Sequence, residues 1–376
     1  MRTVGVEEEL LLVDGGSGRP LSVAERVLAR AHEREQLSPS DPEPGTEVPG
    51  GVLEGELQRQ QLETDTHPRA DVAELEHELR EWRDRAVAAA RDVGARVVAL
   101  GTSPLPVEPR PATTPRYQHM VERFGLTTME QLVCGCHVHV AVEGDDEAVA
   151  VLDRIRVWLP CLLAISANSP FWQGKDTGYA SFRSQVMTRW PTSGPPPLSG
   201  SSEAYRSLVT DMVESGVLLD EGMVYFDARA SFRYPTVEIR AADVCLDADD
   251  AVLVAALSRG LVETAAREWQ SGRPAPRTPT ELLRLATWQA ARDGAHGTLL
   301  DPATSLPRPA SGVLHDLLEH VRPALQDAGD EALVEQRLAQ VLERGTGARR
   351  QRQVLERTGQ LVDVLADAAN VTAGAS

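Results

Sequence analysis

Three short segments of the chain each carry a pair of chemically active side chains spaced two residues apart. The pairs are Glu7 with Glu9, His137 with His139, and Glu238 with Arg240. Valine or isoleucine lies beside or between the members of every pair, as is typical of strands. Because residues two apart on a strand point to the same face, each pair presents both of its side chains on one side.

If the three strands lie in one sheet, these paired side chains form a metal site. Carboxylates buried together on one face are too costly unless cations compensate them, and Glu63 in a nearby extended segment adds another carboxylate. Glutamate-rich sites suit hard cations, and Mg²⁺ commonly works there with phosphates. A single pair would instead be typical of the solvent-facing side of an antiparallel sheet. Glu8 points to the opposite face, and we expect it to tolerate substitution.

Zinc is the competing interpretation, because Cys134 and Cys136 lie next to His137 and His139. Strand alternation puts the two cysteines on the face of Val138, opposite the histidines. The spacing also matches no common zinc-ribbon or zinc-finger pattern. A hard cation bound mainly by glutamate therefore remains the favoured interpretation.

Guanidinium groups must hold the anionic ligands of this protein, because Lys175 is its only lysine. Arg183, Arg229 and Arg240 lie near the metal-site segments and are candidates for paired hydrogen bonds to a carboxylate or phosphate. Three more arginines lie at a Gly-rich helix start: Arg349, Arg350 and Arg352. That group is either solvated surface or an anion site at a helix N-terminus.

The elements that must position these side chains indicate an α+β fold, in which an antiparallel sheet is covered by helices. Strands are predicted at 4–13, 52–64, 97–100, 133–142, 224–229 and 235–242. Helices are predicted at 22–36, 71–93, 147–166, 250–269, 280–292, 311–326, 330–343 and 346–368. Loops are expected at 38–51 and 168–200, and the second is long enough to be functional. Trp172 and Trp288 are expected in the core, and residues 1–376 are expected to form one domain.

The bulk composition narrows the classes of partner. The net charge of −18, from 38 basic and 56 acidic residues, argues against a nucleic-acid partner. No apolar stretch approaches the roughly 18 residues of a membrane helix, and no signal-peptide pattern begins the chain. Four cysteines are too few for a disulfide scaffold, so we expect reduced thiols and a cytoplasmic location. The lack of a Gly-x-x-x-x-Gly-Lys-Ser/Thr loop excludes a P-loop ATPase.

Seven blocks of sequence, taken in order, resemble the type 2 glutamate–cysteine ligase, or carboxylate–amine ligase, family over nearly the whole chain. The blocks are GVEEEL (5–10), ELQRQQLET (56–64), CGCHVHV (134–140), ANSPFWQGKDTGYASFRS (167–184), PTSGPP (191–196), TVEIRAAD (236–243) and WQAARDG (288–294). The resemblance implies a fold like the catalytic domain of glutamine synthetase, with an antiparallel sheet as the floor of a funnel-shaped site.

The same resemblance implies roles for individual residues. The implied Mg²⁺ ligands, with Mn²⁺ as an alternative ion, are Glu7, Glu9, Glu63, His137 and Glu238. The implied substrate or ATP contacts are Arg183, Arg229, Arg240, Glu56 and His139. Glu238 and Arg240 are implied as catalytic, Arg240 as a phosphate contact. Glu56 is a further ligand candidate, but on an ideal strand it points away from Glu63, seven residues later, so Glu63 is the stronger of the two.

The implied activity is ATP-dependent amide formation. A substrate carboxylate, that of glutamate by the family's example, is phosphorylated, and an amine such as cysteine or another amino acid then displaces phosphate. The 168–200 loop would act as a lid that protects the acyl phosphate from water. Ser103 departs from the family pattern, because a histidine is expected before Pro104, so the substrate specificity could differ.

Three other classes of function stay open at this point. A phosphotransferase on the same scaffold would make a stable phosphorylated product. A metal-dependent hydrolase would use the His-x-His strand without ATP. A non-catalytic binding protein would retain the fold alone. A monomer and a homo-oligomer are equally open.

Overall fold

An antiparallel sheet runs through the protein, and the computed structural model describes residues 1–36 and 50–374. The strands follow the order β2, β3, β1, β5, β9, β8, with β4 attached to β1. Their bounds are β1 (Val4–Asp14), β2 (Val52–Gly55), β3 (Gln61–Asp65), β4 (Ala95–Val98), β5 (Gly135–Ala141), β8 (Ala228–Ala230) and β9 (Thr236–Asp243). The three strands with polar pairs, β1, β5 and β9, are direct neighbours, and the predicted α+β class is confirmed.

Strand β1 organises the sheet because its two halves pair with different strands on the same edge. The first half pairs with β5, from Val4 opposite Val140 onward. The second half pairs with β4, from Leu11 opposite Val98 onward. Strand β3 pairs along the other edge of β1. The acidic residues of β1 therefore lie between β3 and β5.

Helices cover the apolar face of the sheet. Val6 on β1, Val138 on β5 and Ile239 on β9 are buried in one core with side chains of many helices, among them four that contact these strands. These helices are α2 (Val72–Asp92), α5 (Asp145–Ile155), α6 (Leu159–Ser166) and α9 (Ala248–Gln270). Because alternate residues point to opposite faces, the polar pairs of the same strands lie on the face away from this core.

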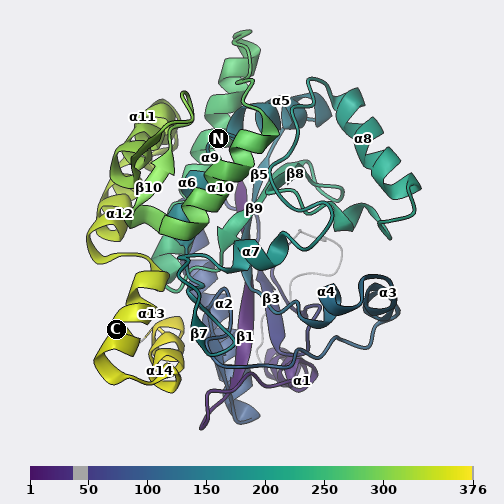
Figure 1. The fold of residues 1–376 in the computed structure, drawn as a ribbon, viewed down its shortest axis with the longest axis vertical. Coiled ribbons are helices and arrows are strands. Elements are labelled where there is room, and N and C mark those ends of the chain that lie inside the picture. Colours follow the sequence, from purple (N-terminus) through teal and green to yellow (C-terminus); the bar gives the residue numbers. More distant parts are fainter. Residues whose placement is uncertain (37–49, 375–376) are drawn as a thin grey trace.

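Most of the remaining helices flank the sheet on two sides. In Figure 1, α11 to α14 lie along the left of the view and α3, α4 and α8 along the right, with the strands between them. The bounds are α1 (Ala24–Gln36), α3 (Pro115–Phe124), α4 (Leu126–Met129), α8 (Ser202–Glu214), α10 (Thr280–Asp293), α11 (Ala310–Ala328), α12 (Glu331–Arg344), α13 (Gly347–Thr358) and α14 (Leu361–Thr372). Two short strands, β10 (Thr298–Leu300) and β11 (Pro307–Pro309), form a separate hairpin.

Two predicted helices are each divided in the structure. The segment predicted at 147–166 is α5 followed by α6, because Pro160 is tolerated in the first turn of a helix and disrupts a helix interior. The segment predicted at 346–368 is α13 followed by α14, because Gly359, with a φ of 71°, ends α13 in the left-handed conformation. The predicted start of α2 is confirmed, since the Asp71 side chain accepts a hydrogen bond from the backbone N–H of Ala73.

Other predictions for extended and irregular segments were wrong. The single strand predicted at 52–64 is a hairpin, in which β2 turns back to pair with β3. The loop predicted at 168–200 contains β6 (Phe171–Trp172) paired with β7 (Lys175–Asp176), and α7 (Arg183–Met187). Helices α3, α4 and α8 were not predicted. The loop predicted at 38–51 lies outside the described residues except for its last two.

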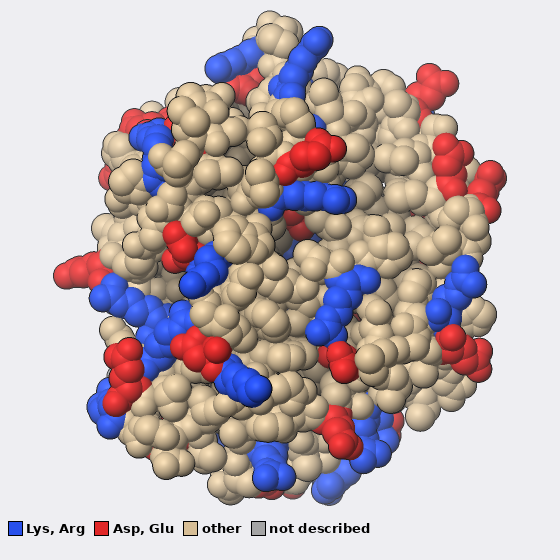
Figure 2. Space-filling model, viewed as in Figure 1, with Lys and Arg blue, Asp and Glu red and all other residues tan. Residues whose placement is uncertain are grey.

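The distribution of surface charge and the hydrophobicity of the helices are relevant to the classes of partner expected from the composition. In Figure 2, acidic and basic side chains are interspersed over the face that is drawn. Within residues 1–36 and 50–374, no helix combines the length and the hydrophobicity that crossing a membrane requires.

Candidate active site

The register of the sheet brings the three polar pairs together on one face, as the sequence predicts. The cross-strand partners are Glu7 with His137, Glu9 with Glu63, and His139 with Glu238. The register between β5 and β9 shifts between Cys136 and Val138, where β9 contains one extra residue between Ile239 and Ala242. Carboxylate and imidazole groups from four adjacent strands, β3, β1, β5 and β9, therefore meet over a short distance.

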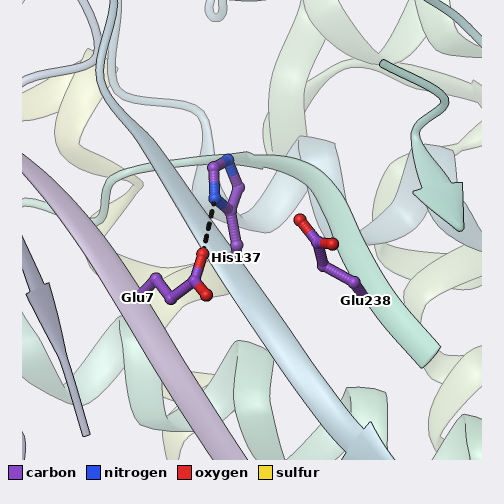
Figure 3. A group of neighbouring side chains, drawn as sticks. All are labelled: Glu7, His137 and Glu238. Carbon is purple, nitrogen blue, oxygen red and sulfur yellow. Dashed lines mark hydrogen bonds and ion pairs between the residues drawn. The ribbon is translucent and has the colours of Figure 1, made fainter. Parts of the chain in front are cut away.

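The first group that could hold a cation consists of Glu7, His137 and Glu238. One ligand atom of each lies within 4.8 Å of the others. Figure 3 shows the three side chains rising from neighbouring strands, with Glu7 and His137 directed toward each other. The Nδ1 atom of His137 lies 3.2 Å from Oε2 of Glu7. The Nε2 atom of His139 lies 2.9 Å from the other oxygen of Glu7.

Two further groups share residues with the first. Glu9, Glu63 and His137 have ligand atoms within 4.8 Å of one another, and so do Glu7, Glu63 and Asp65. Asp65 was missed in the sequence, although it follows Glu63 by two residues and so shares its face. The strand-alternation rule that selected the other pairs would have selected it too.

Burial and mutual repulsion raise the pKa of several of these carboxyl groups. Burial, with repulsion from Glu56, Glu7 and Glu9, raises the pKa of Glu63 well above its usual range. Burial and repulsion from Glu9 raise the pKa of Glu56 to about 7. Burial and the nearby Glu7 raise the pKa of Asp65 to about 7 as well. The chain therefore supplies too few cations for these carboxylates, which is the condition that a bound metal ion relieves.

The carboxylates of Glu238 and Glu7, in contrast, have partners in the chain that stabilise their negative charge. Burial raises the pKa of Glu238, but Arg240 and Arg229 outweigh it and bring the pKa down to about 2. Burial likewise opposes ionisation of Glu7, yet hydrogen bonds with His137 and His139 hold its pKa well below the usual range. Both carboxylates are therefore ionised at neutral pH and ready to coordinate a cation.

The chemistry of the donor set fits a hard divalent cation. The Nε2 atom of His137 is buried and has no hydrogen-bond partner among the described residues, and neither has Oδ1 of Asp65. Burial and the proximity of Arg240 lower the pKa of His137, which favours the neutral imidazole that a metal requires. Oxygen ligands dominate the site, as Mg²⁺ prefers.

The cysteines do not join the site, which removes the basis for zinc. Cys136 is buried in the core beneath the sheet together with Val138. Cys134 is buried too, and its sulfur lies 3.6 Å from Nε2 of Gln61. No cysteine belongs to any metal-capable group within the described part of the chain.

Glu56 lies in the site despite the alternation argument against it. Strand alternation applies only within one continuous strand, and the chain turns between β2 and β3, so the seven-residue spacing has no meaning there. Glu56 lines a small cavity of about 50 Å³ together with Glu9, His137 and Arg240. The hydroxyl of Tyr117 on α3 donates a hydrogen bond of 3.0 Å to Glu56. Tyr117 was missed because nothing in its local sequence links it to the sheet.

Arg183 and Arg240 line the same small cavity. Arg240 forms an ion pair with Glu238. Arg183 is buried, and its Nε atom has no partner within the described residues. Gly135 makes room for it, because a Cβ at this position would collide with the guanidinium of Arg183 and lie 3.0 Å from Nε2 of His137. The two arginines thus supply positive charge beside the acidic cluster.

Arg229 lies in the site but is already bound by the chain. Its guanidinium donates to both oxygens of Glu238, at 2.7 and 3.2 Å. It also donates to the carbonyl oxygens of Gly222 and Val224. With these bonds made, Arg229 orients Glu238 and is not among the residues that line the cavities described here.

A larger cavity of about 390 Å³ adjoins the small one. The two cavities share Arg183, Met187, Trp190, Tyr225 and Arg240. The larger one also reaches Asp227, Arg284 and Trp288. The core position expected for Trp288 is wrong, because 44% of this residue is exposed. Trp190, Tyr225 and Asp227 were not singled out in the sequence, because isolated residues in irregular segments give no periodic signal.

Two other predictions concern residues away from the cluster. Arg350 forms two hydrogen bonds with Asp367, and Arg352 forms two with Asp176. Their charges are therefore neutralised, which does not support the anion site considered at this helix start. Ser103, at the expected histidine position, is buried, and its hydroxyl donates to the carbonyl oxygen of Leu105.

Glu8 points to the other face, as predicted, but its expected tolerance is wrong. The side chain is fully buried, and Arg83 of α2 donates to both of its oxygens at 2.8 and 2.6 Å. Removing this carboxylate would leave a buried guanidinium without its counterion.

Known proteins resemble the chain over almost all of its length. The profile of glutamate-cysteine ligase family 2 (GCS2) matches residues 3–368. The chain is 55% identical over 374 residues to the "Putative glutamate–cysteine ligase 2-1" of Streptomyces avermitilis, with 100% of both chains covered. It is 52% identical over 366 residues to the "Putative glutamate–cysteine ligase 2" of Streptomyces coelicolor, covering 97% of this chain and 98% of that protein.

A solved structure shares the fold at much lower identity. The glutamate–cysteine ligase of Francisella tularensis, solved in complex with AMP, superposes with a TM-score of 0.68 at 12% sequence identity. The superposition covers 99% of this chain and 88% of that one. At this identity the likeness concerns the arrangement of the sheet and helices.

Proposed function

The chain belongs to glutamate–cysteine ligase family 2 and is a ligase, and we propose that it joins the γ-carboxylate of glutamate to an amine with ATP as the phosphoryl donor. The observation that carries the proposal is the buried cluster of Glu7, Glu9, Glu63, His137 and Glu238, which adjoins a cavity lined by Arg183 and Arg240. Such a site can hold the metal–nucleotide complex and an anionic substrate side by side.

The proposed reaction has two steps. A carboxylate oxygen of glutamate attacks the γ-phosphorus of ATP, so that an acyl phosphate forms and ADP leaves. The amine nitrogen then attacks the acyl carbon, the C–O bond to phosphate breaks, and an amide and inorganic phosphate result. Arg240 stabilises the charge on the transferred phosphoryl group, and Arg183 orients the carboxylate.

The cluster has enough ligands for two metal ions. Glu7, His137 and Glu238 would hold one Mg²⁺ ion, and Glu9, Glu63 and Glu56 would hold another, with Mn²⁺ as an alternative. A bound ion supplies positive charge that neutralises the phosphates. His139 contacts Glu7 and lies opposite Glu238, so it can orient both or contact ATP. Arg229 fixes Glu238 through its two hydrogen bonds.

We assign the reaction to a single catalytic domain in the cytoplasm. Helices α11 and α12 share one core with the sheet, and α14 packs in a second core with β1 and β4, which supports one domain over residues 1–376. The donor glutamate and the acceptor, cysteine or another amino acid, are small molecules. The acyl phosphate requires shelter from water, and the segment around β6, β7 and α7 is the candidate lid.

A screen for ADP release tests the proposal. Purified protein is mixed with Mg²⁺-ATP, glutamate and a panel of amines and amino acids, and ADP release should depend on both glutamate and one amine. ADP release without an amine, together with a stable phosphorylated product, would identify a phosphotransferase. Activity without ATP would identify a hydrolase, and failure to bind ATP would exclude the ligase.

The variant Glu238→Gln tests the placement of the site. It should lower ATP turnover at least about 100-fold, because it removes a charged group at the phosphoryl-transfer centre. Glu214→Gln, at the exposed end of α8, is the matched control and should turn over ATP like the wild type. Wild-type turnover by Glu238→Gln would show that the site assignment is wrong.

A further inference from the structure

The larger cavity, of about 390 Å³, contains charged groups that neither phosphoryl transfer nor metal binding uses. Asp227 precedes β8, and Arg284 lies on α10. We propose that this cavity binds the amine acceptor as an α-amino acid, with Asp227 pairing with its ammonium group and Arg284 with its carboxylate. This inference rests on the ligase function proposed above and adds the recognition of the second substrate.

The position of Asp227 places a bound ammonium group beside the reacting centre. The carbonyl oxygen of Asp227 accepts a 2.8 Å hydrogen bond from the backbone N–H of Arg240. Asp227 lies two residues before Arg229, which is paired with Glu238 on the site face. Alternation therefore puts Asp227 on that face as well, next to Arg240. The amine must reach an acyl carbon whose phosphate is held at Arg240, so Asp227 is suitably placed to guide it.

The charges of the cavity call for a ligand with both signs. Asp227 is the only carboxylate among the described residues that line it. Neither Asp227 nor Arg284 forms a side-chain hydrogen bond or ion pair with any part of the chain that the structure describes. Arg189, which also lines the cavity, is paired with Glu130. Burial raises the pKa of Asp227 to about 6, against the influence of Arg183 and Arg284, so a cationic partner would stabilise its ionised form.

The walls of the cavity favour the acceptor over the glutamate donor. Leu159, Leu163, Trp190 and Phe226 are buried apolar residues that line it, and Trp288 forms part of its exposed rim. A polar glutamate side chain gains little from such walls, whereas a small apolar or sulfur-containing side chain would be desolvated favourably. The lining thus favours an α-amino acid with a weakly polar side chain.

Two variants and two acceptors separate the predicted contacts. L-cysteine and cysteamine differ only in the carboxylate, and ADP release is measured with each at saturating Mg²⁺-ATP and glutamate. Asp227→Asn should raise the KM for both acceptors about 10-fold or more, as expected for loss of a charge-assisted hydrogen bond. Arg284→Gln should raise the KM for L-cysteine by a similar factor and leave cysteamine unchanged. The KM values for ATP and glutamate should stay within about twofold in both variants.

A control variant and a binding measurement distinguish failure of the acceptor site from failure of the ligase function. Arg292→Gln removes a guanidinium that lies on the same helix as Arg284, α10, but does not line the cavity. This variant should leave the KM for both acceptors unchanged. A raised KM for glutamate in Asp227→Asn, or equal effects of Arg284→Gln on both acceptors, would overturn the inference. If the wild type releases no ADP with any acceptor, the ligase function fails instead. Calorimetric binding of L-cysteine then decides the site: binding that Asp227→Asn abolishes supports it, and equal or absent binding overturns it.

Discussion

The two faces of β1 treat buried carboxylates in opposite ways. On the covered face, Glu8 receives two hydrogen bonds from Arg83, and Arg83 also donates to the carbonyl oxygens of Cys245 and Leu246. Every charge of that pair is satisfied within the chain. On the open face, Glu9 and Glu63 lie opposite each other with other carboxylates around them. There the chain has assembled like charges and left them short of cations.

This difference separates Glu8 from Glu9 and Glu63, whereas Glu238 on the open face has Arg229 and Arg240 as counterions. Glu8 and Glu9 are both buried, so burial does not distinguish them. What distinguishes them is whether the protein supplies the counterion. A buried carboxylate whose cation lies in the chain stabilises the fold only as part of its pair. One whose neighbours raise its pKa, such as Glu63, is poised for a cation from outside.

Glu63→Gln should break the functional side of this comparison and have the largest effect. Because the pKa of Glu63 is raised well above its usual range, its neutral amide analogue resembles the form that it adopts without metal. We expect ADP release to fall about 10³-fold, on the order of 4 kcal/mol of lost transition-state stabilisation. The melting temperature without metal should stay the same or rise. Steady-state kinetics and calorimetry measure the two quantities. If the melting temperature falls so far that unfolding accounts for the lost activity, Glu63 is structural.

Glu8→Gln should give the reverse result. It removes the counterion of the buried Arg83, and breaking such a pair typically costs about 3 kcal/mol of unfolding free energy. Turnover per folded molecule should remain near that of the wild type. Denaturant unfolding followed by circular dichroism measures the loss. The double variant Glu8→Gln/Arg83→Met should recover part of it, because no unpaired charge remains. Loss of turnover without loss of stability would contradict the assignment of Glu8 to the fold.

The residues on the open face of the sheet could be predicted from the sequence, because the pattern that reveals them is local. Each polar pair on β1, β5 and β9 is set among residues typical of strands, and alternation alone assigns the faces. That the three strands are neighbours required the structure or the family resemblance. The counterion of Glu8 was beyond prediction, since Arg83 lies 75 residues away on a helix with many arginines. The expected tolerance of Glu8 to substitution was therefore wrong, although the predicted orientation of its side chain was right.

Predictions also failed where the chain turns without a strong signal. The hairpin of β2 and β3 has no Asn-Gly or Pro at its bend, so one strand was predicted and Glu56 was given the wrong face. The division of α5 from α6 was readable from Pro160. Asp227 and Tyr117 belong to the site only through tertiary packing. Such residues carry no periodicity, and sequence reasoning on a single chain has no means of selecting them.

Gly135→Ala should displace Arg183 from the acidic cluster, with a smaller effect on catalysis than Glu63→Gln. The added methyl group would collide with the guanidinium of Arg183, which must then move from the cavity that it shares with Glu9. We expect the KM for glutamate to rise about 10-fold, or about 1.4 kcal/mol. Gly144→Ala is the control, since a Cβ there meets no atom within 4 Å in the described structure. If Gly135→Ala keeps the wild-type KM, Arg183 does not orient the carboxylate.

The smallest effect concerns pH, and it sharpens the contrast between the two faces. Glu56 and Asp65 have a pKa of about 7 in the folded protein, against ordinary values of 4.5 and 3.8. Between these values the folded state binds more protons than the unfolded state, so stability without metal must fall as pH rises from about 5 to 7. His139, whose pKa is raised by Glu7 against burial, acts in the same direction, while His137, whose pKa is lowered, opposes it.

We therefore expect the melting temperature of the metal-free protein to be a few degrees higher at about pH 5.5 than at about pH 8. Added Mg²⁺ should raise it more at the higher pH, because the ion binds the ionised carboxylates and replaces the protons that they have lost. Scanning fluorimetry with MgCl₂, and with NaCl at equal ionic strength as the control, measures both effects. Glu8→Gln should keep this pH response, since its face holds none of these four groups, and Glu63→Gln should reduce it. A pH response lost in Glu8→Gln and kept in Glu63→Gln would reverse the roles of the two faces.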